Sequence, residues 1–221
     1  MTLVKICGLM RPDDVDAAVE AGADLVGFIL VEATPRYLDL DAARALAARV
    51  PEGVKTVAVI NAGTAPLAGF DLTQTYDTST HIRDGSGSDP APPIGTNGAG
   101  VDRGRDGDGA VSGLIVAGRG EVPQNVPDGV PMLLDLAFGS RPAAAELRAH
   151  WARAASVRQP VILAGSLDPA NVADAVRAAR PWGVDTARGV ETSPGIKDHA
   201  LVRAFIRNAK EIGRASCRER V

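Results

Sequence analysis

The chain has 221 residues, a net charge of −3 and an apolar content of 45%. This length accommodates one α/β barrel or one open α/β domain, and we expect a single domain over residues 1–210. The slightly negative charge gives no electrostatic case for binding nucleic acid or an anionic membrane surface. No apolar run approaches the roughly 20 residues of a membrane span. We expect no signal peptide, because the chain enters its first predicted strand at once.

The cysteines and histidines of the chain show no spacing typical of a cross-link or a metal site. Cys7 and Cys217 lie far apart and give no disulfide framework, and a free Cys7 fits a reducing cytoplasm. His81, His150 and His199 have no metal-ligand spacing. The glycine-rich loops that bind nucleotide cofactors are also missing from the sequence. We therefore expect a cytoplasmic protein with neither metal nor cofactor.

Short apolar runs alternate with helical segments along the chain, which is typical of a parallel sheet covered by helices. Several runs are continuous in Val, Ile and Leu, as expected for strands that are buried on both faces. The predicted strands are residues 3–7, 25–30, 55–60, 72–76, 113–117, 132–136, 160–164 and 183–185.

Helices are predicted at residues 11–21, 40–49, 141–155, 169–180 and 199–209. Asp168 followed by Pro169 is a typical helix start, and Asp198 is a second N-cap candidate. In the last helix we expect Leu201, Val202 and Phe205 to point inward.

The middle of the chain departs from this alternation. Residues 82–112 are rich in Gly and Asp and contain almost no bulky apolar side chain, so we expect a disordered loop there. A local frameshift in the coding sequence is the alternative. The links 61–71 and 119–131 are short and rich in Gly and Pro, so the helical layer is expected to be thin around strands three to five.

Residues 211–221 depart from the preceding helical pattern. Their back-translation resembles a common sequencing-library adapter, and we interpret them as a read-through artefact. An ordinary basic tail is the alternative.

Small or reactive residues stand where several predicted strands end. Cys7 ends the first strand, Asp135 follows three apolar residues, and glycines follow the last two strands. In a closed β/α barrel, catalytic and phosphate-binding groups lie at strand ends. The pattern therefore indicates an enzyme that acts on a small phosphorylated substrate.

Cys7 and Asp135 are the candidate acid–base residues. A cysteine acting as a base must be a thiolate, which requires a nearby cation or dipole. Asp135 would act as an acid if apolar surroundings kept it protonated. A structural cysteine and a helix cap are the alternatives for these two residues. The glycines at strand ends are either an anion site or simple turn residues.

Several motifs together resemble those of the phosphoribosylanthranilate isomerases of tryptophan biosynthesis. They are Lys5-Ile-Cys-Gly-Leu9, Gly22-Ala-Asp24, Pro35-Arg-Tyr37, Leu133-Leu-Asp135, Gly183-Val-Asp185, Gly189-Val-Glu191 and Ser193-Pro-Gly-Ile-Lys-Asp198. The resemblance covers about residues 2–60 and 130–209 and implies a (β/α)8 TIM barrel. It also implies an Amadori rearrangement of N-(5-phosphoribosyl)anthranilate to 1-(2-carboxyphenylamino)-1-deoxyribulose 5-phosphate, without metal or redox cofactor.

The resemblance assigns roles by position. Cys7 is the general base, Asp135 the general acid, and Arg36 the ligand of the anthranilate carboxylate. Further substrate contacts, mainly to the phosphate, fall on Gly165, Ser166, Asp185, Ala187, Arg188 and Gly189.

The chain also departs from the family pattern. Ala187-Arg188 stands where the family has two serines, and the usual Gln-x-His-Gly survives only as Gln74. Two alternative functions remain open: a non-catalytic barrel that serves as a binding module, and another phosphosugar isomerase or epimerase. Retention of Cys7, Asp135 and Arg36 favours the isomerase over both alternatives.

Overall fold

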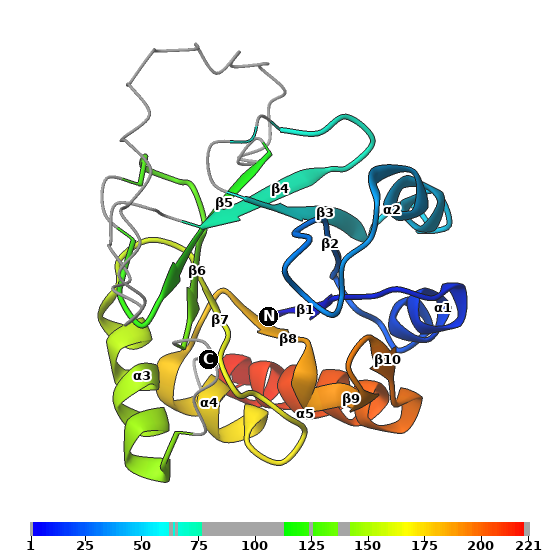
Figure 1. Ribbon diagram of the computed structural model, residues 1–221. Coiled ribbons are helices and arrows are strands. Elements are labelled where there is room, and N and C mark those ends of the chain that lie inside the picture. The colour runs from blue at the N-terminus through cyan, green and yellow to red at the C-terminus, as the bar shows by residue number, and fades with distance from the viewer. Residues whose placement is uncertain are drawn as a thin grey trace.

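The computed structural model describes residues 2–61, 64, 66–76, 113–123, 126–136 and 142–218. The loop predicted to be disordered, residues 82–112, lies outside these ranges. The described part forms a closed barrel of eight parallel strands in sequential order (Figure 1). The barrel prediction is therefore confirmed, and the open-sheet alternative is excluded.

The barrel strands are short and start and end close to the predicted residues. Those predicted at 3–7, 55–60 and 72–76 are found with the same bounds, and the others differ by one or two residues at either end. The strands are β1 (Leu3–Cys7), β2 (Leu25–Ile29), β3 (Lys55–Ile60), β4 (Leu72–Tyr76), β5 (Leu114–Arg119), β6 (Met132–Asp135), β7 (Val161–Leu163) and β8 (Gly183–Thr186).

Alternation along the strands separates the barrel interior from the layer beneath the helices. One buried apolar cluster contains Leu25, Val57 and Leu133, and it fills part of the barrel interior. Neighbouring residues such as Val26 and Leu134 belong instead to the cluster that packs against the helices. Because successive side chains of a strand point to opposite faces, Lys5 and Cys7, which flank Ile6 on β1, share one face.

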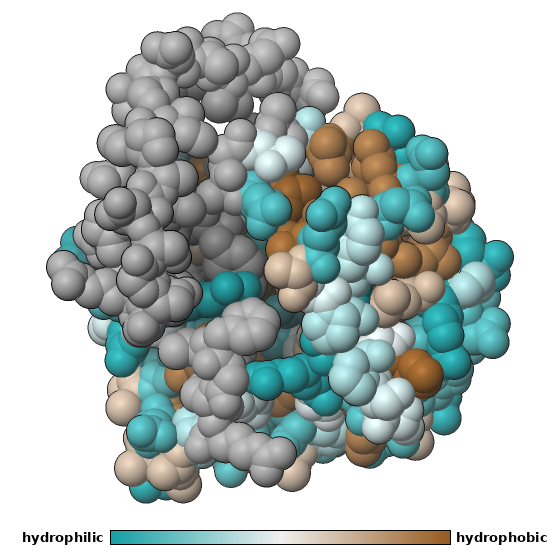
Figure 2. All heavy atoms as spheres, viewed as in Figure 1, coloured by the Kyte–Doolittle hydropathy of each residue, from teal (hydrophilic) through white to brown (hydrophobic). Residues whose placement is uncertain are grey.

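Among the described residues, five α-helices cover part of the barrel. They are α1 (Pro12–Glu20), α2 (Leu40–Ala47), α3 (Ala144–Ser156), α4 (Val172–Ala179) and α5 (His199–Arg218). Figure 1 shows α1 and α2 beside β1 to β3, and α3 to α5 on the side of β6 to β8. Between β3 and β6 the described residues contain no helix, and this includes the described parts of the links 61–71 and 119–131, where none was predicted. Figure 2 shows hydrophobic residues at the surface on the side of the molecule where β3 and β4 lie.

Asp39 caps the start of α2 and Asp198 that of α5, and Asp168 lies in the turn before α4. Asp198 accepts hydrogen bonds from the main-chain N–H groups of Ala200 and Leu201, as predicted. The start predicted for α4 at Pro169 is wrong, because the helix begins at Val172. Residues 169–171 form a turn instead. In that turn Asn171 donates to the carbonyl of Ser166 and accepts from the main chain of Asp168.

Two features of the C-terminal part were not predicted. A 3-10 turn, η1 (Arg188–Val190), leads into a hairpin of β9 (Glu191–Ser193) and β10 (Ile196–Lys197), which is too short to produce a sequence pattern. Helix α5 continues to Arg218 instead of ending near Ala209, since Ala, Arg and Glu sustain a helix there. In the described part of the chain no helix is both long and apolar enough to cross a bilayer.

The inward face of α5 gives a test of the packing. Phe205 is fully buried, whereas Leu201, predicted to point inward, is 37% exposed. Phe205→Ala is expected to lower the free energy of unfolding by about 3–5 kcal/mol, because it leaves a cavity. Leu201→Ala, on the same helix, should change it by about 0.5 kcal/mol or less. Chemical denaturation measures both, and equal losses would contradict this packing.

Candidate active site

Cys7 is the last residue of β1, and its thiol lies at the interior of the barrel mouth. The residue is 5% exposed and pairs with Gly27 of β2. A Cβ atom at position 27 would lie only 2.9 Å from the Cys7 Sγ, so glycine leaves the space that the thiol occupies. Burial raises the pKa of Cys7, and the neighbouring Lys5 ammonium opposes that rise.

Lys5 lies below Cys7 on the same face of β1 and is completely buried. Its Nζ donates to Oδ1 of Asp185 on β8, at 3.1 Å, and to Oε1 of Gln74 on β4, at 3.0 Å. Since β4 is three strands away from β1, the lysine side chain crosses the barrel interior. Burial lowers the pKa of Lys5, but the charges of Asp185 and Cys7 together raise it by more than burial lowers it. The pKa therefore lies above its ordinary value, and the ammonium stays charged.

Asp135 ends β6 at the same mouth. Its Oδ1 accepts a hydrogen bond of 2.8 Å from the main-chain N–H of Leu136. Burial, followed by the negative charge of Asp185, raises the pKa of Asp135 to about 6, although Arg119 and Arg188 act in the opposite direction. A carboxyl with this pKa can donate a proton near neutral pH, as a general acid must.

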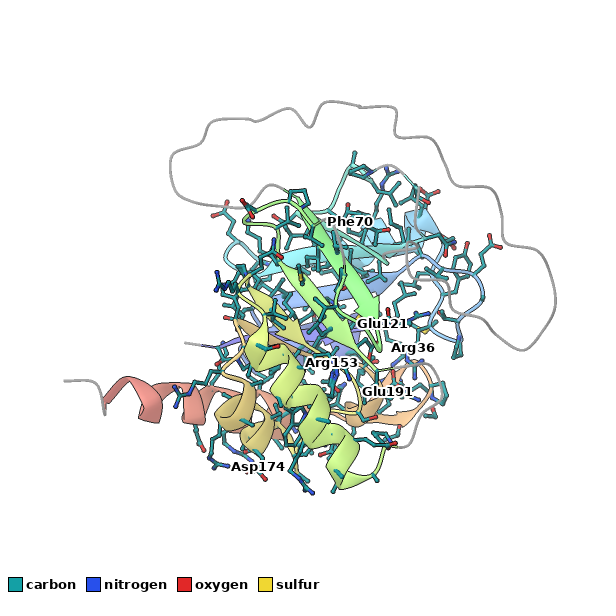
Figure 3. The ribbon with its side chains drawn as sticks, turned by 90° about the vertical axis from the view of Figure 1, so that its left-hand side faces the viewer. Arg36, Phe70, Glu121, Arg153, Asp174 and Glu191 are labelled. Carbon is teal, nitrogen blue, oxygen red and sulfur yellow. The ribbon has the colours of Figure 1, made fainter. Side chains whose placement is uncertain are left out.

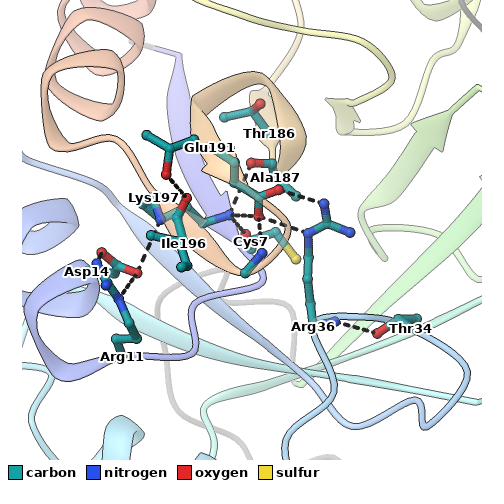
Figure 4. Close-up of polar contacts among 12 residues, drawn as sticks. Cys7, Arg11, Asp14, Thr34, Arg36, Thr186, Ala187, Glu191, Ile196 and Lys197 are labelled. Atoms are coloured by element: carbon teal, nitrogen blue, oxygen red, sulfur yellow. Dashed lines mark hydrogen bonds and ion pairs between the residues drawn. The ribbon is translucent and has the colours of Figure 1, made fainter.

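Arg36, in the loop after β2, is held by a carboxylate from the end of the barrel. Its Nε and Nη2 donate to the two carboxylate oxygens of Glu191, at 2.8 and 2.6 Å (Figures 3 and 4). Glu191 also accepts from Lys197 Nζ at 2.8 Å, and Lys197 donates to the carbonyls of Cys7 and Ala187 (Figure 4). The two cations lower the pKa of Glu191 against the effect of burial. This network ties the β2 loop to the ends of β1 and β8.

The loops after β7 and β8 touch one another. Thr186 Oγ1 donates to the carbonyl of Leu167 at 2.7 Å, and a Cβ at Gly189 would overlap the same carbonyl oxygen. Gly165 has a φ of +89° and Ser166 a φ of 54°, both in the left-handed region. Main-chain groups of the two loops are thus brought close together, an arrangement that suits an anion.

All nine residues predicted for the site lie at the carboxyl ends of barrel strands or in the loops that follow. Asp185 differs from the expectation in its surroundings, because its carboxylate is bound to Lys5 inside the barrel. Arg188 is exposed at the start of η1. The remaining seven are Cys7, Arg36, Asp135, Gly165, Ser166, Ala187 and Gly189. Within the described ranges, no group of three or more His, Cys, Asp or Glu side chains is arranged to hold a metal ion.

Sequence reasoning assigned no role to Lys5, Gln74, Glu191 and Lys197. A signal for Lys5 was present, because a lysine two residues before Cys7 in an apolar strand must share its face. Glu191 and Lys197 gave a weaker signal. Both stand in the quoted motifs, but only the hairpin of β9 and β10 brings them together.

A closed barrel with reactive side chains at the carboxyl ends of its strands is typical of a barrel enzyme. A family model described as N-(5'phosphoribosyl)anthranilate (PRA) isomerase matches residues 132–208. The N-(5'-phosphoribosyl)anthranilate isomerase of Myxococcus xanthus is 37% identical over 226 residues, covering 95% of this chain and 96% of the relative. That of Thiobacillus denitrificans is also 37% identical, over 94% of this chain and 97% of the relative. The chain belongs to this isomerase family.

Solved structures agree with the assignment. The phosphoribosyl anthranilate isomerase of Thermotoga maritima superposes with a TM-score of 0.68 at 25% identity, covering 96% of this chain and 100% of that one. A further structure of such an isomerase, in complex with reduced 1-(o-carboxyphenylamino)-1-deoxyribulose 5-phosphate, has a TM-score of 0.63 at 26% identity, with the same coverage.

The raised pKa of Asp135 predicts a stability cost that depends on pH. Its folded-state pKa of about 6 lies above the unfolded value, so the folded state loses stability as the pH rises from about 4 through about 6. Asparagine resembles the protonated carboxyl and cannot ionise. Asp135→Asn is therefore expected to raise the free energy of unfolding near pH 8 by about 1–3 kcal/mol, with no gain near pH 4.

Denaturant titrations at the two pH values measure this difference. Asp71→Asn is the matched control of opposite sign, because Thr56 and Lys55 outweigh burial and lower the pKa of Asp71. That variant should be less stable than the wild type near neutral pH, with the difference shrinking as the pH falls through the folded pKa. An increase in the free energy of unfolding of Asp135→Asn that is the same at both pH values would contradict the raised pKa of Asp135.

Proposed function

We propose that the chain converts N-(5-phosphoribosyl)anthranilate to 1-(2-carboxyphenylamino)-1-deoxyribulose 5-phosphate, an Amadori rearrangement in tryptophan biosynthesis. Family membership supports this reaction. The observation that carries it is the pairing of a buried thiol beside an ammonium with a carboxyl of raised pKa, both at one barrel mouth. The reaction needs these two groups and a grip on the two anionic ends of the substrate.

The proton transfers follow from the two side chains. Asp135 donates its proton to the furanose ring oxygen, and the C1–O bond breaks to leave a protonated Schiff base. The Cys7 thiolate then removes the proton from C2, and the electron pair of that C–H bond forms the enolamine. Tautomerisation of the enolamine gives the ketone. The protons pass between the substrate and the two side chains, so Asp135 ends one proton short and Cys7 ends with one more. A proton returns from Cys7 to Asp135 through solvent before the next turnover, and no redox partner is required.

Arg36 is assigned to the anthranilate carboxylate. Glu191 binds the edge formed by Nε and Nη2 and so fixes the plane of the guanidinium. We assign the edge formed by Nη1 and Nη2 to the substrate, since a guanidinium grips a carboxylate with two parallel hydrogen bonds. The phosphate is assigned to the main-chain N–H groups of Gly165, Ser166 and Gly189, with Arg188 nearby. A free Cys7 base would suit the reducing cytoplasm, where we place the protein.

Removal of either acid–base group should nearly abolish turnover. Cys7→Ala and Asp135→Asn are each expected to lower kcat by about 10²–10⁴-fold, the usual contribution of a general acid or base. Loss of substrate fluorescence measures the rate, and circular dichroism checks the fold. Cys217→Ala, which replaces the other cysteine of the chain, should keep the wild-type rate.

Complementation extends the same test to the cell. The wild-type gene should restore growth of a tryptophan auxotroph lacking this isomerase, and the Cys7→Ala gene should not. Wild-type turnover by a folded Cys7→Ala or Asp135→Asn protein would overturn the assigned roles. Failure of the wild type in both assays would instead favour the non-catalytic alternative.

The loops after β7 and β8 should bind inorganic phosphate. Gly165→Val should abolish the binding, because its φ is unsuited to valine and its Cβ would lie 2.7 Å from Leu136 Cγ. Gly53→Val is the matched control, since Gly53 has a similar φ of +95° and no atom near its added Cβ. Arg188→Ser, which restores the usual family residue, should stay within about tenfold of wild-type affinity, or about 1.4 kcal/mol.

Isothermal titration calorimetry measures these affinities, with melting temperatures to confirm folding. Phosphate affinity that survives Gly165→Val unchanged would place the phosphate elsewhere.

A further inference from the structure

We propose that Lys5 is a positioning residue whose ammonium, fixed across the barrel interior by Asp185 and Gln74, stabilises the thiolate form of Cys7. The inference rests on the proposed function, in which Cys7 is the base. The inference adds Lys5 as the group that favours the thiolate of Cys7. It also assigns the Asp185 carboxylate to an ion pair with Lys5 instead of to the substrate.

The geometry leaves the lysine head group little freedom. Lys5 is fully buried, Gln74 is 2% exposed and Asp185 is 9% exposed. The three side chains come from β1, β4 and β8 and meet inside the barrel, with Nζ at 3.0 and 3.1 Å from its two acceptors. Lys5 and Asp185 are also direct register partners in the β1–β8 pairing. The ammonium could move out to bulk water only by breaking both of these hydrogen bonds.

Gly27 shows that the lysine and the thiol share one small space. A Cβ at Gly27 would lie 2.9 Å from Cys7 Sγ and 3.2 Å from Lys5 Cε. The sulfur and the terminal carbon of the lysine therefore both pack against the same point of β2. A charge held so close to a thiol, away from bulk water, acts on it with little screening.

Four charged side chains of the described residues act on Cys7, and they come from four different segments of the chain. They are Lys5 on β1, Arg36 after β2, Asp185 on β8 and Lys197 on β10. Arg36 and Lys197 both bind Glu191, and Lys197 donates to the Cys7 carbonyl rather than to its sulfur. Lys5 is the strongest of the influences that lower the pKa of the thiol, and Asp185 opposes it.

The test measures thiolate formation without substrate. The pH dependence of the ultraviolet thiolate absorbance is recorded for the full chain, minus that of the same protein carrying Cys7→Ser. An opposite charge within about 4–6 Å typically changes the ratio of thiolate to thiol at a given pH by about tenfold or more. Lys5→Met should therefore lower the thiolate fraction of Cys7 by about tenfold or more below its titration midpoint.

The double variant Lys5→Met/Asp185→Asn protects the test against misfolding, because it leaves no unpaired buried charge. It also removes the carboxylate that opposes ionisation, so its midpoint should lie between those of the wild type and Lys5→Met. Lys55→Met is the matched control, because Lys55 forms a 3.0 Å pair with Asp71 at the other end of the barrel. This control should titrate like the wild type.

A wild-type titration curve for folded Lys5→Met, or for the double variant, would overturn the proposal. A shifted curve together with a wild-type chain that lacks isomerase activity would leave the Lys5 inference standing and overturn the proposed function instead. In the active enzyme, the shift should appear as a matching displacement of the limb of the kcat/KM profile that reports Cys7.

Discussion

The buried ammonium of Lys5 is the constraint on which the mouth of this barrel depends. Below it the interior is packed with apolar side chains, and a charge at this level is tolerable only when it is fully hydrogen-bonded. Asp185 and Gln74 meet that requirement from two other strands, so one lysine links β1, β4 and β8 through the centre of the molecule. Alternation along β1 then places Cys7 directly above it.

Asp185 connects the two groups that are proposed to carry the reaction, Cys7 and Asp135. Its charge holds the Lys5 ammonium, opposes ionisation of Cys7 and raises the pKa of Asp135. The proposed mechanism needs a thiolate and a protonated carboxyl together, whereas ordinary pKa values give the reverse order of ionisation. A carboxyl with a pKa of about 6 and a cation beside the thiol both enlarge the share of molecules in the reactive form. The raised pKa of Asp135 also means that its ionised form reduces the stability of the fold at high pH.

The sequence predicted the barrel well, because its strands are continuous apolar runs and a helix cap such as Asp198 is a local signal. It predicted less of the site. Cys7 and Asp135 end strands and could be found, but the partners of Lys5 are 69 and 180 residues away and meet only when the barrel closes. The start of α4 was misplaced because Asn171 diverts the first turn into loop contacts. Leu201 was misplaced because its face of α5 is not covered.

The decisive experiment is a crystal structure of the chain with reduced 1-(o-carboxyphenylamino)-1-deoxyribulose 5-phosphate. The phosphate should lie on the main chain of Gly165 and Gly189, and the Cys7 sulfur should lie within about 3.5 Å of C2. Lys5 should still bind Asp185 and Gln74 beneath the ligand. A phosphate bound elsewhere, or a Lys5 side chain turned away from the thiol, would contradict the proposed mechanism.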